Sequence, residues 1–498
     1  MENNMKNNIK KFNKGMNNRG SATIFMVLLL IPIVVFFCMV IRYAQLAATK
    51  GMAADAVSLA NNAIYASYNQ PMRDAYGIYC YTKTDTEMTD IANYYMDKSM
   101  DVNAQVYGVV VYQGESLDND AVFTQQIVDY MGNWDKVAGN VTGYQLQRMV
   151  QIRERAVEIN EQFKEDYEKA VDSTYTAEPV ADESEADGSS DTGEMSVSLS
   201  DAEEAREYAV GIINVDFQTL NFTSGKNEDK PNYENSVSFI ESTTPVIDCD
   251  NSNEINLSHG IQIMDNAINY LEPSDKAFQS WLNKDTNYKV ALYAYNNFSS
   301  FQYFGSAALT GNYYESGDVV SISPWAETEF ILNGTDSDQN NAETVKRMIY
   351  DCLVMEYVTI LYDSCMNNEE IQEYAEVLSG GNPDRIQLIK DEFLIGIAAK
   401  LAFDKICNCV YEFGYSSDTT FGSYPYYIEY FLMLETQRDY SGMLSRMKYT
   451  ITANMQNPTS SAQANEFSFD NAYLMPVIDS YHVNVTPSFG GVMSFEGR

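Results

Sequence analysis

The feature that most constrains this chain is a run of twenty uncharged residues near the N-terminus, residues 22–41. At about 1.5 Å per residue, a helix of this length spans about 30 Å, the thickness of the hydrocarbon core of a bilayer. Pro32 lies near the middle of the run, where it removes one backbone hydrogen bond and favours a kink. The sequence therefore predicts one transmembrane helix, with the lipid bilayer as its first partner.

Charged residues flank this run unequally. Five basic residues precede it, whereas only Arg42 and Lys50 follow it closely. Because basic residues favour the cytoplasmic side, we expect a cytoplasmic N-terminus and an extracellular remainder. A cleaved secretory signal has a shorter apolar core, of about 7–15 residues, followed by small residues at the cleavage site. The sequence after this run offers no convincing site, so we expect a retained single-pass anchor in the cell membrane.

Outside the anchor the chain is strongly acidic. The 498 residues include 32 Lys and Arg against 70 Asp and Glu, a net charge of −38. Residues 1–42 hold six of the basic residues and one acid, so the remainder carries 26 basic and 69 acidic residues. Such a surface repels phosphate backbones, which argues against nucleic acid as a partner, and it attracts cations or basic proteins.

Length and patterning predict an α+β, helix-dominated fold. An apolar fraction of 45% in a chain of this length is enough for two to four domains. The expected segments are, in order, a cytoplasmic basic segment (1–21), the transmembrane helix (22–41), a helical stalk (42–72), an α+β head segment with a long helix (73–175), an acidic flexible linker (176–200) and a helix-rich C-terminal ectodomain ending in short strands (201–498).

Local patterns predict individual elements within these segments. Residues 43–67 are rich in alanine and no proline follows until Pro71, so the transmembrane helix is expected to continue to about Ser67. Asp118 or Asp120 is expected to cap a helix that ends near residue 131. A strand is expected over 102–112, further helices over 87–99, 145–171, 259–272, 288–298, 341–366, 384–413, 424–436 and 439–456, and short strands between 467 and 485.

The stalk has many small side chains, which permit the close approach of another helix. Two arrangements are open at this point. In the first, the stalk associates laterally with a neighbouring membrane helix. In the second, it is an ordinary helix that folds against the head of its own chain.

Two oxygen-rich stretches resemble calcium loops but lack key ligands. Their alternating side chains are Asp248, Asp250 and Ser252 in the first, and Asp336, Asp338 and Asn340 in the second. In the first, Asn253 replaces the turn glycine and His259 stands where a bidentate glutamate belongs; the second ends on Arg347. We therefore expect turns and helix N-caps here, and no metal site.

Other catalytic patterns are equally incomplete. The Asp-Thr-Gly triplet from Asp191 to Gly193 matches an aspartic protease motif, but it lies in the acidic linker without strands to bury a proton-sharing pair. The two histidines, His259 and His482, belong to no metal or hydrolase motif. Each is expected to be a surface or capping residue.

Seven cysteines leave the disulfide pattern open. Cys38 lies in the apolar run, and the other six are Cys80, Cys249, Cys352, Cys365, Cys407 and Cys409. Cys352 and Cys365 are separated by about 20 Å along one predicted helix, so they cannot pair with each other. Any disulfide must join different elements, and no paired cysteine or histidine ligands suggest zinc.

The anchor and the sequence after it resemble a known family. The residues Arg-Gly-Ser-Ala-Thr-Ile-Phe (19–25), the apolar run and the segment 54–81 are similar to an uncharacterised single-span family of Gram-positive bacteria. That family is associated with Tad (Flp) pilus-assembly loci and is akin to the TadE/TadG pseudopilins. Further similar segments follow in the same order, at 125–131, 295–301, 327–334, 424–435 and 446–455.

This resemblance points to Gly20 and Ser21 as a candidate processing site. Prepilin peptidases cut after a glycine that follows basic residues and precedes the apolar helix, and Gly20 follows Arg19. Type IV pilins usually carry glutamate at the fifth mature position, which here is Phe25, and residues 21–41 contain no acid. This departure argues against polymerisation as a major pilin.

The resemblance implies a non-enzymatic surface protein that serves a Tad-type pilus or secretion system as a structural or assembly accessory, similar to a minor pseudopilin. Its expected partners are pilus or envelope proteins, and no catalytic, cofactor or metal residues are expected. The alternative is a membrane-anchored extracellular binding or adhesion module, for which the 37 tyrosines and the acidic surface are mild support. An envelope hydrolase is the least favoured class because no catalytic motif supports it.

Overall fold

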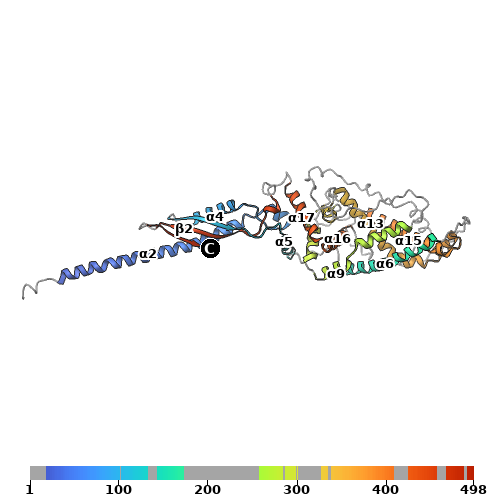
Figure 1. Ribbon diagram of the computed structural model, residues 1–498, viewed down its shortest axis with the longest axis horizontal. Helices are drawn as coiled ribbons and strands as arrows, with labels where there is room; N and C mark the ends of the chain where they lie inside the picture. The colour runs from blue at the N-terminus through green and yellow to red at the C-terminus, as the bar shows by residue number, and fades with distance from the viewer. Residues whose placement is uncertain are drawn as a thin grey trace, which may run out of the picture. The chain divides into compact units, whose positions relative to one another are not determined.

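The computed structural model is dominated by helices and contains one three-stranded antiparallel sheet, which confirms the predicted α+β, helix-dominated class (Figure 1). The expected linker at 176–200 lies outside the described part of the chain. The described residues are 18–100, 103–132, 143–172, 257–283, 286–298, 300, 327–334, 338–408, 424–456, 467–486 and 491–497.

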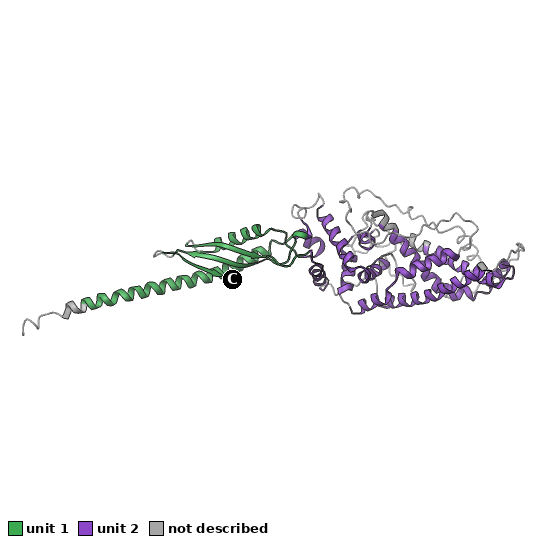
Figure 2. Ribbon diagram, in the orientation of Figure 1, with its two compact units in different colours: residues 1–69, 79–117, 470–498 green, residues 70–78, 118–469 purple. Residues whose placement is uncertain are grey.

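The chain divides into two compact units that alternate along the sequence (Figure 2). Unit 1 comprises Met1–Asn69, Tyr79–Leu117 and Asp470–Arg498, and unit 2 comprises Gln70–Ile78 and Asp118–Phe469. The C-terminal strands therefore belong with the N-terminal helix. This grouping differs from the expected segments, which placed those strands with the C-terminal helices.

In its described part, unit 1 contains two α-helices and the sheet. The helices are α2 (Asn18–Tyr65) and α4 (Asp85–Ser99), and the strands are β1 (Ala104–Tyr112), β2 (Val477–Val485) and β3 (Met493–Gly497). The central strand β2 pairs antiparallel with β1 on one side and β3 on the other. The single helix through the apolar run and the stalk is confirmed, as are β1 and α4. β3 lies beyond the region in which the sequence predicted strands.

The second half of α2 forms part of the core of unit 1. Ala53, Ala56, Ala60 and Ile64 are buried, and their spacing of three or four residues places them on one face of the helix. This face packs against α4 and the sheet, in a cluster that includes Met88, Ala92, Met96, Val106 and Val483. The small side chains therefore serve packing within the chain, and this face is not available to a neighbouring membrane helix.

Two helix starts show how the chain satisfies its first backbone N–H groups. Thr84 and Glu87 form a reciprocal capping box at the start of α4. At α5 (Asp120–Gly132), the side chain of Asn119 accepts from the backbone N–H of Ala121 at 2.9 Å. The prediction of Asp118 or Asp120 as the cap was wrong, because the adjacent asparagine takes that position.

Unit 2 is helical in its described part. Its helices are α3 (Gln70–Tyr76), α5, α6 (Gly143–Asp172), α8 (Leu257–Tyr270), α9 (Ser274–Asn283), α10 (Thr286–Asn297), α12 (Glu327–Asn333), α13 (Asp338–Met366), α14 (Glu369–Ser379), α15 (Pro383–Asn408), α16 (Tyr424–Arg438) and α17 (Tyr440–Met455). Every helix predicted in this region is present, whereas the shorter α3, α9, α12 and α14 were not predicted. The long helix α13 packs against α6, α8, α15 and α16 and forms the centre of the unit.

Candidate functional site

The first half of α2 exposes a continuous apolar surface. Its large side chains are between 40% and 67% exposed, and none of this stretch is covered by the described parts of the chain. These residues are Ile24, Phe25, Met26, Val27, Leu28, Leu29, Leu30, Ile31, Ile33, Val34, Val35, Phe36, Phe37, Met39, Val40 and Ile41. An apolar surface of this size is not stable in water. The helix is long and apolar enough to cross a membrane, as a single-pass anchor or as a signal sequence.

The candidate processing residues lie at the beginning of the same helix. Gly20 and Ser21 fall in the first turn of α2, directly before the exposed apolar surface. Phe25 is 62% exposed and stands one turn further along. The structure thus places the glycine where the basic segment meets the apolar helix.

Those motif residues that the structure describes do not come together into a site. Asp191, Gly193, Asp248 and Asp336 lie outside the described residues, as does most of the first calcium-like stretch. Asp338 begins α13, and Asn340 lies in its first turn. Further along this helix, Arg347 Nε lies 3.4 Å from Asp351 Oδ1. Arg347 therefore forms an ion pair with a buried carboxylate. Among the described residues, no group of His, Cys, Asp and Glu is arranged to hold a metal ion.

The two histidines belong to different units. His259 lies in the first turn of α8, in unit 2. His482 lies in β2, in unit 1, where its ring stacks on Tyr107 of β1 with centroids 5.5 Å apart. Gly108 adopts a positive φ of 59° beside this pair, and a side chain there would meet the His482 ring. These contacts assign His482 a packing role on the outer face of the sheet.

The described cysteines are unpaired. They are Cys38, Cys80, Cys352 and Cys365, of which the last three are buried. Burial raises the pKa of Cys80 and that of Cys365 to about 12, so both thiols are protonated at neutral pH and unreactive. The side chains of Cys249, Cys407 and Cys409 lie outside the described residues, so a disulfide between elements remains a prediction there.

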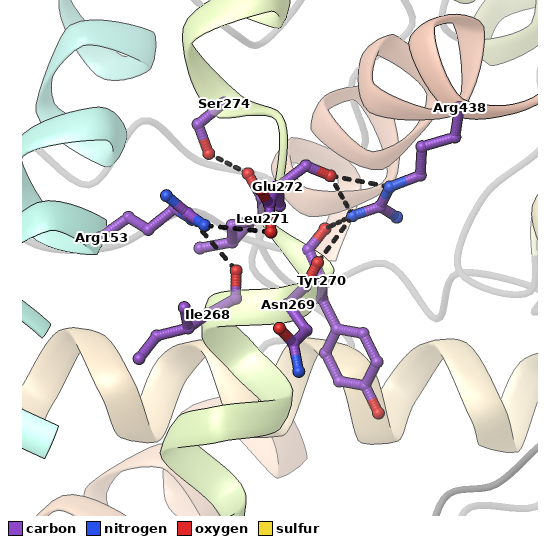
Figure 3. A network of polar contacts seen from close by, with 8 residues as sticks. All are labelled: Arg153, Ile268, Asn269, Tyr270, Leu271, Glu272, Ser274 and Arg438. Carbon is purple, nitrogen blue, oxygen red and sulfur yellow. Dashed lines mark hydrogen bonds and ion pairs between the residues drawn. The ribbon is translucent and has the colours of Figure 1, made fainter. Parts of the chain in front are cut away.

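Two arginines of unit 2 converge on the C-terminal end of α8 (Figure 3). Arg438 donates from Nε to the carbonyl of Glu272 at 2.8 Å and from Nη2 to the carbonyl of Asn269 at 2.9 Å. Arg153 donates from Nε to the carbonyl of Ile268 at 3.1 Å, and its Nη2 lies 3.4 Å from the Glu272 carboxylate. Cations at the C-terminal end of a helix donate hydrogen bonds to its last carbonyls and interact favourably with the negative end of its dipole. The cluster therefore joins α6, α8 and α16.

A further arginine, Arg446, is buried with two acidic partners between α16 and α17. Arg446 is 3% exposed, and its Nη2 lies 2.7 Å from Glu435 Oε1 while its Nη1 lies 3.2 Å from Asp439 Oδ2. Its Nε donates to the carbonyl of Ile331 at 2.6 Å. Burial raises the pKa of Glu435 to about 7, and the charge of Arg446 opposes that rise. The Arg446 guanidinium thus donates hydrogen bonds to the two carboxylates and to the Ile331 carbonyl that the helices enclose.

A third buried charge lies in the centre of unit 2. Asp351 on α13 is fully buried, beside Arg347 and with one oxygen 3.4 Å from the amide nitrogen of Asn266. Burial raises its pKa to about 7, while Arg347 and Asn266 oppose the rise. Since the pKa of an aspartate in an unfolded chain is close to 3.8, folding and protonation of Asp351 are coupled.

We expect unit 2 to lose stability as the pH rises from about 4 to 7. Below this window Asp351 is protonated in both states, whereas within it only the unfolded chain releases the proton, at a cost to stability of up to about 1.4 kcal/mol per pH unit. Asp351→Asn should therefore flatten this decline. Urea unfolding followed by tryptophan fluorescence measures it for unit 2 alone, because Trp134, Trp281 and Trp325 all lie between residues 118 and 469.

The matched control for this prediction is Asp363→Asn. Asp363 lies on the same helix, but its side chain is 84% exposed, so its removal should leave the slope of stability against pH unchanged. Equal slopes for Asp351→Asn and the wild type would contradict the coupling.

Comparisons of the chain with protein-family models, with curated proteins and with solved structures find no match. The assignment of function therefore depends on the residues themselves. Sequence reasoning missed the buried charges Asp351, Glu435 and Arg446. The signal that could have found them is a single charge inside an apolar helical run, as at Glu435 after four apolar residues.

Proposed function

We propose that this protein is a non-enzymatic, single-pass surface protein that serves a Tad-type pilus or secretion system as a structural or assembly accessory, similar to a minor pseudopilin. The observation that carries this proposal is α2. One unbroken helix presents an exposed apolar half at residues 24–41 and a packed half at residues 53–64. A helix of this kind holds a folded unit at a fixed position above a membrane.

The distribution of charge supports an anchor in unit 1 and a water-exposed unit 2. Unit 1 holds 10 of the 32 basic residues and 11 of the 70 acidic ones, so it is nearly neutral. Unit 2 holds the other 22 basic and 59 acidic residues. An acidic unit is repelled by anionic lipid and stays in solution, whereas a nearly neutral one can approach the bilayer.

The pilus connection rests on the resemblance at residues 19–25 and 54–81. Its structural counterpart is the exposed apolar half of α2, which offers neighbouring membrane helices a surface for lateral packing. The buried acids of unit 2 support no catalytic proposal, because Asp351 and Glu435 are enclosed by helices and paired with Arg347 and Arg446. Pilus or envelope proteins are therefore the proposed partners.

Processing after Gly20 is the test of the pseudopilin-like role. We expect the protein extracted from its native membrane to begin at Ser21, because Gly20 separates Arg19 from the apolar helix in the way that prepilin peptidases require. Intact mass and N-terminal sequencing measure this directly. Gly20→Val should block the cut, whereas Gly15→Val, in the same basic segment, should not. A wild-type chain that begins at Met1 or Glu2 would contradict the pseudopilin-like role and leave a permanently anchored scaffold.

A further inference from the structure

The β2–β3 hairpin runs alongside α2 and points toward its apolar half (Figure 1). Near the far end of α2, the backbone N–H of Ile478 donates to Asn61 Oδ1 at 3.1 Å. Nearer the anchor, Lys50 Nζ lies 5.6 Å from the ring centroid of Phe495, the residue paired with Val483 of β2. Strand β2 thus proceeds from the level of Asn61 toward that of Lys50.

The helix and the strand advance by the same distance between these two contacts. Eleven residues of α2 separate Asn61 from Lys50, about 16 Å, and five residues of β2 separate Ile478 from Val483, about 17 Å. The axes of the two elements are therefore close to parallel, with opposite chain directions. The rise per residue of a strand and of a helix therefore gives the level along α2 that each position of the hairpin reaches.

By this reckoning, the end of the hairpin lies level with the end of the apolar run on α2. Phe495 stands beside Lys50, nine residues or about 13 Å beyond Ile41. Val492 lies three residues nearer the turn, about 10 Å closer to the anchor. It is therefore about 3 Å beyond the level of Ile41, within a headgroup layer about 5–7 Å thick.

The chemistry of the hairpin end suits that position. Residues 483–495 contain no Asp, Glu, Lys or Arg, in a chain with a net charge of −38. Val492, the residue directly before β3, is 67% exposed. On α2, Arg42 lies at the level of Val492 and Lys50 lies further from the anchor, beside Phe495, and no acid of this helix precedes Asp55. An uncharged apolar end near Arg42 complements an anionic headgroup layer.

We propose that the end of the β2–β3 hairpin at Val492 rests in the headgroup layer of the bilayer that α2 crosses. The contact gives unit 1 a second point of attachment and fixes its rotation about the axis of α2. The occupant of this surface is phospholipid, and the proposal rests on the membrane anchor proposed above.

An environment-sensitive label at single positions of the full chain tests the contact. The chain is reconstituted in vesicles of phosphatidylcholine and phosphatidylglycerol, with nitrobenzoxadiazole attached to Val492→Cys and, as the matched control, to Met475→Cys. Met475 is 64% exposed in the same unit, but it lies near the opposite end of β2. Wild-type protein treated with the same reagent gives the background. We expect headgroup-labelled quencher lipids to reduce emission at 492 at least twofold more than at 475.

A third labelled variant, Leu30→Cys, separates the two proposals. Leu30 lies in the middle of the exposed apolar half and should be quenched by lipids labelled on the acyl chain. If Leu30 is quenched and Val492 behaves like Met475, the hairpin contact is wrong and the anchor stands. If Leu30 is not quenched, the anchor itself is wrong, and the hairpin contact falls with it.

Discussion

A chain that lacks residues 1–42 is expected to leave the membrane fraction and to remain folded. The deletion removes the exposed apolar half of α2, whose fourteen Leu, Ile, Phe and Val side chains favour the bilayer by about 0.3–0.6 kcal/mol each. It spares Ala53, Ala56, Ala60 and Ile64, which pack in the core of unit 1. Sedimentation after an alkaline carbonate wash measures the release, with the full chain in the pellet and the shortened one in the supernatant.

The control is a longer deletion, of residues 1–60. It also removes the anchor, but it takes Ala53, Ala56 and Ala60 out of the core and leaves the sheet without its main helix. Unit 1 of this variant should lose its protection, which limited proteolysis between residues 79 and 117 detects. Persistent sedimentation of the chain lacking residues 1–42 would contradict a single anchor. The Val492 contact is too small to retain it, since burying one such side chain contributes about 1.5–3 kcal/mol.

Local sequence patterns were sufficient for the long apolar helix and for most of the other helices. The apolar run and the alanine-rich segment after it specify one long helix because both depend on neighbouring residues alone. The strand at 104–112 was predicted for the same reason, from its β-branched and aromatic residues. Short helices such as α9 and α12 were not predicted, because ten or fewer residues contain too few turns for a clear periodicity.

The grouping of segments into units could not be predicted in this way. β1 pairs with β2 from Ala104 opposite Val485, across more than three hundred residues that form unit 2. Nothing local in either strand specifies its partner. The stalk was left open for a similar reason: its small residues fit a membrane helix and a folded head equally well, and only the position of α4 decides between them.

The same distinction between local patterns and distant contacts applies to the candidate functional residues. Gly20 and Ser21 could be proposed from the sequence because a processing motif is a contiguous string of residues, and their role stays a prediction. The buried charges Asp351 and Arg446 were missed, since their role depends on helices distant in sequence, such as the contact of Arg446 with the carbonyl of Ile331. Charge inside an apolar helical run is therefore a useful signal for such residues.

Arg446→Met is expected to be the most destabilising substitution in unit 2. It leaves the Glu435 carboxylate and the Ile331 carbonyl enclosed without their donor, and the loss of one partner of a buried ion pair costs about 3–5 kcal/mol. Urea unfolding of the full chain in detergent at pH 8, followed by tryptophan fluorescence, measures the loss. Arg155→Met is the matched control, because the pair of Arg155 with Glu158 is exposed and contributes about 0–1 kcal/mol.

The pH dependence of this loss identifies its cause. Without Arg446, the main charge that opposes the effect of burial on Glu435 is lost and only that of Arg438 remains, so the pKa of that carboxyl rises further above about 7. At pH 6 Glu435 is then protonated in the folded state and no longer a buried charge, so the loss should be smaller than at pH 8. Adding Glu435→Gln should likewise recover part of the stability at pH 8. A loss that is equal at both pH values, and that Glu435→Gln does not reduce, would show that Arg446 acts through packing instead of charge.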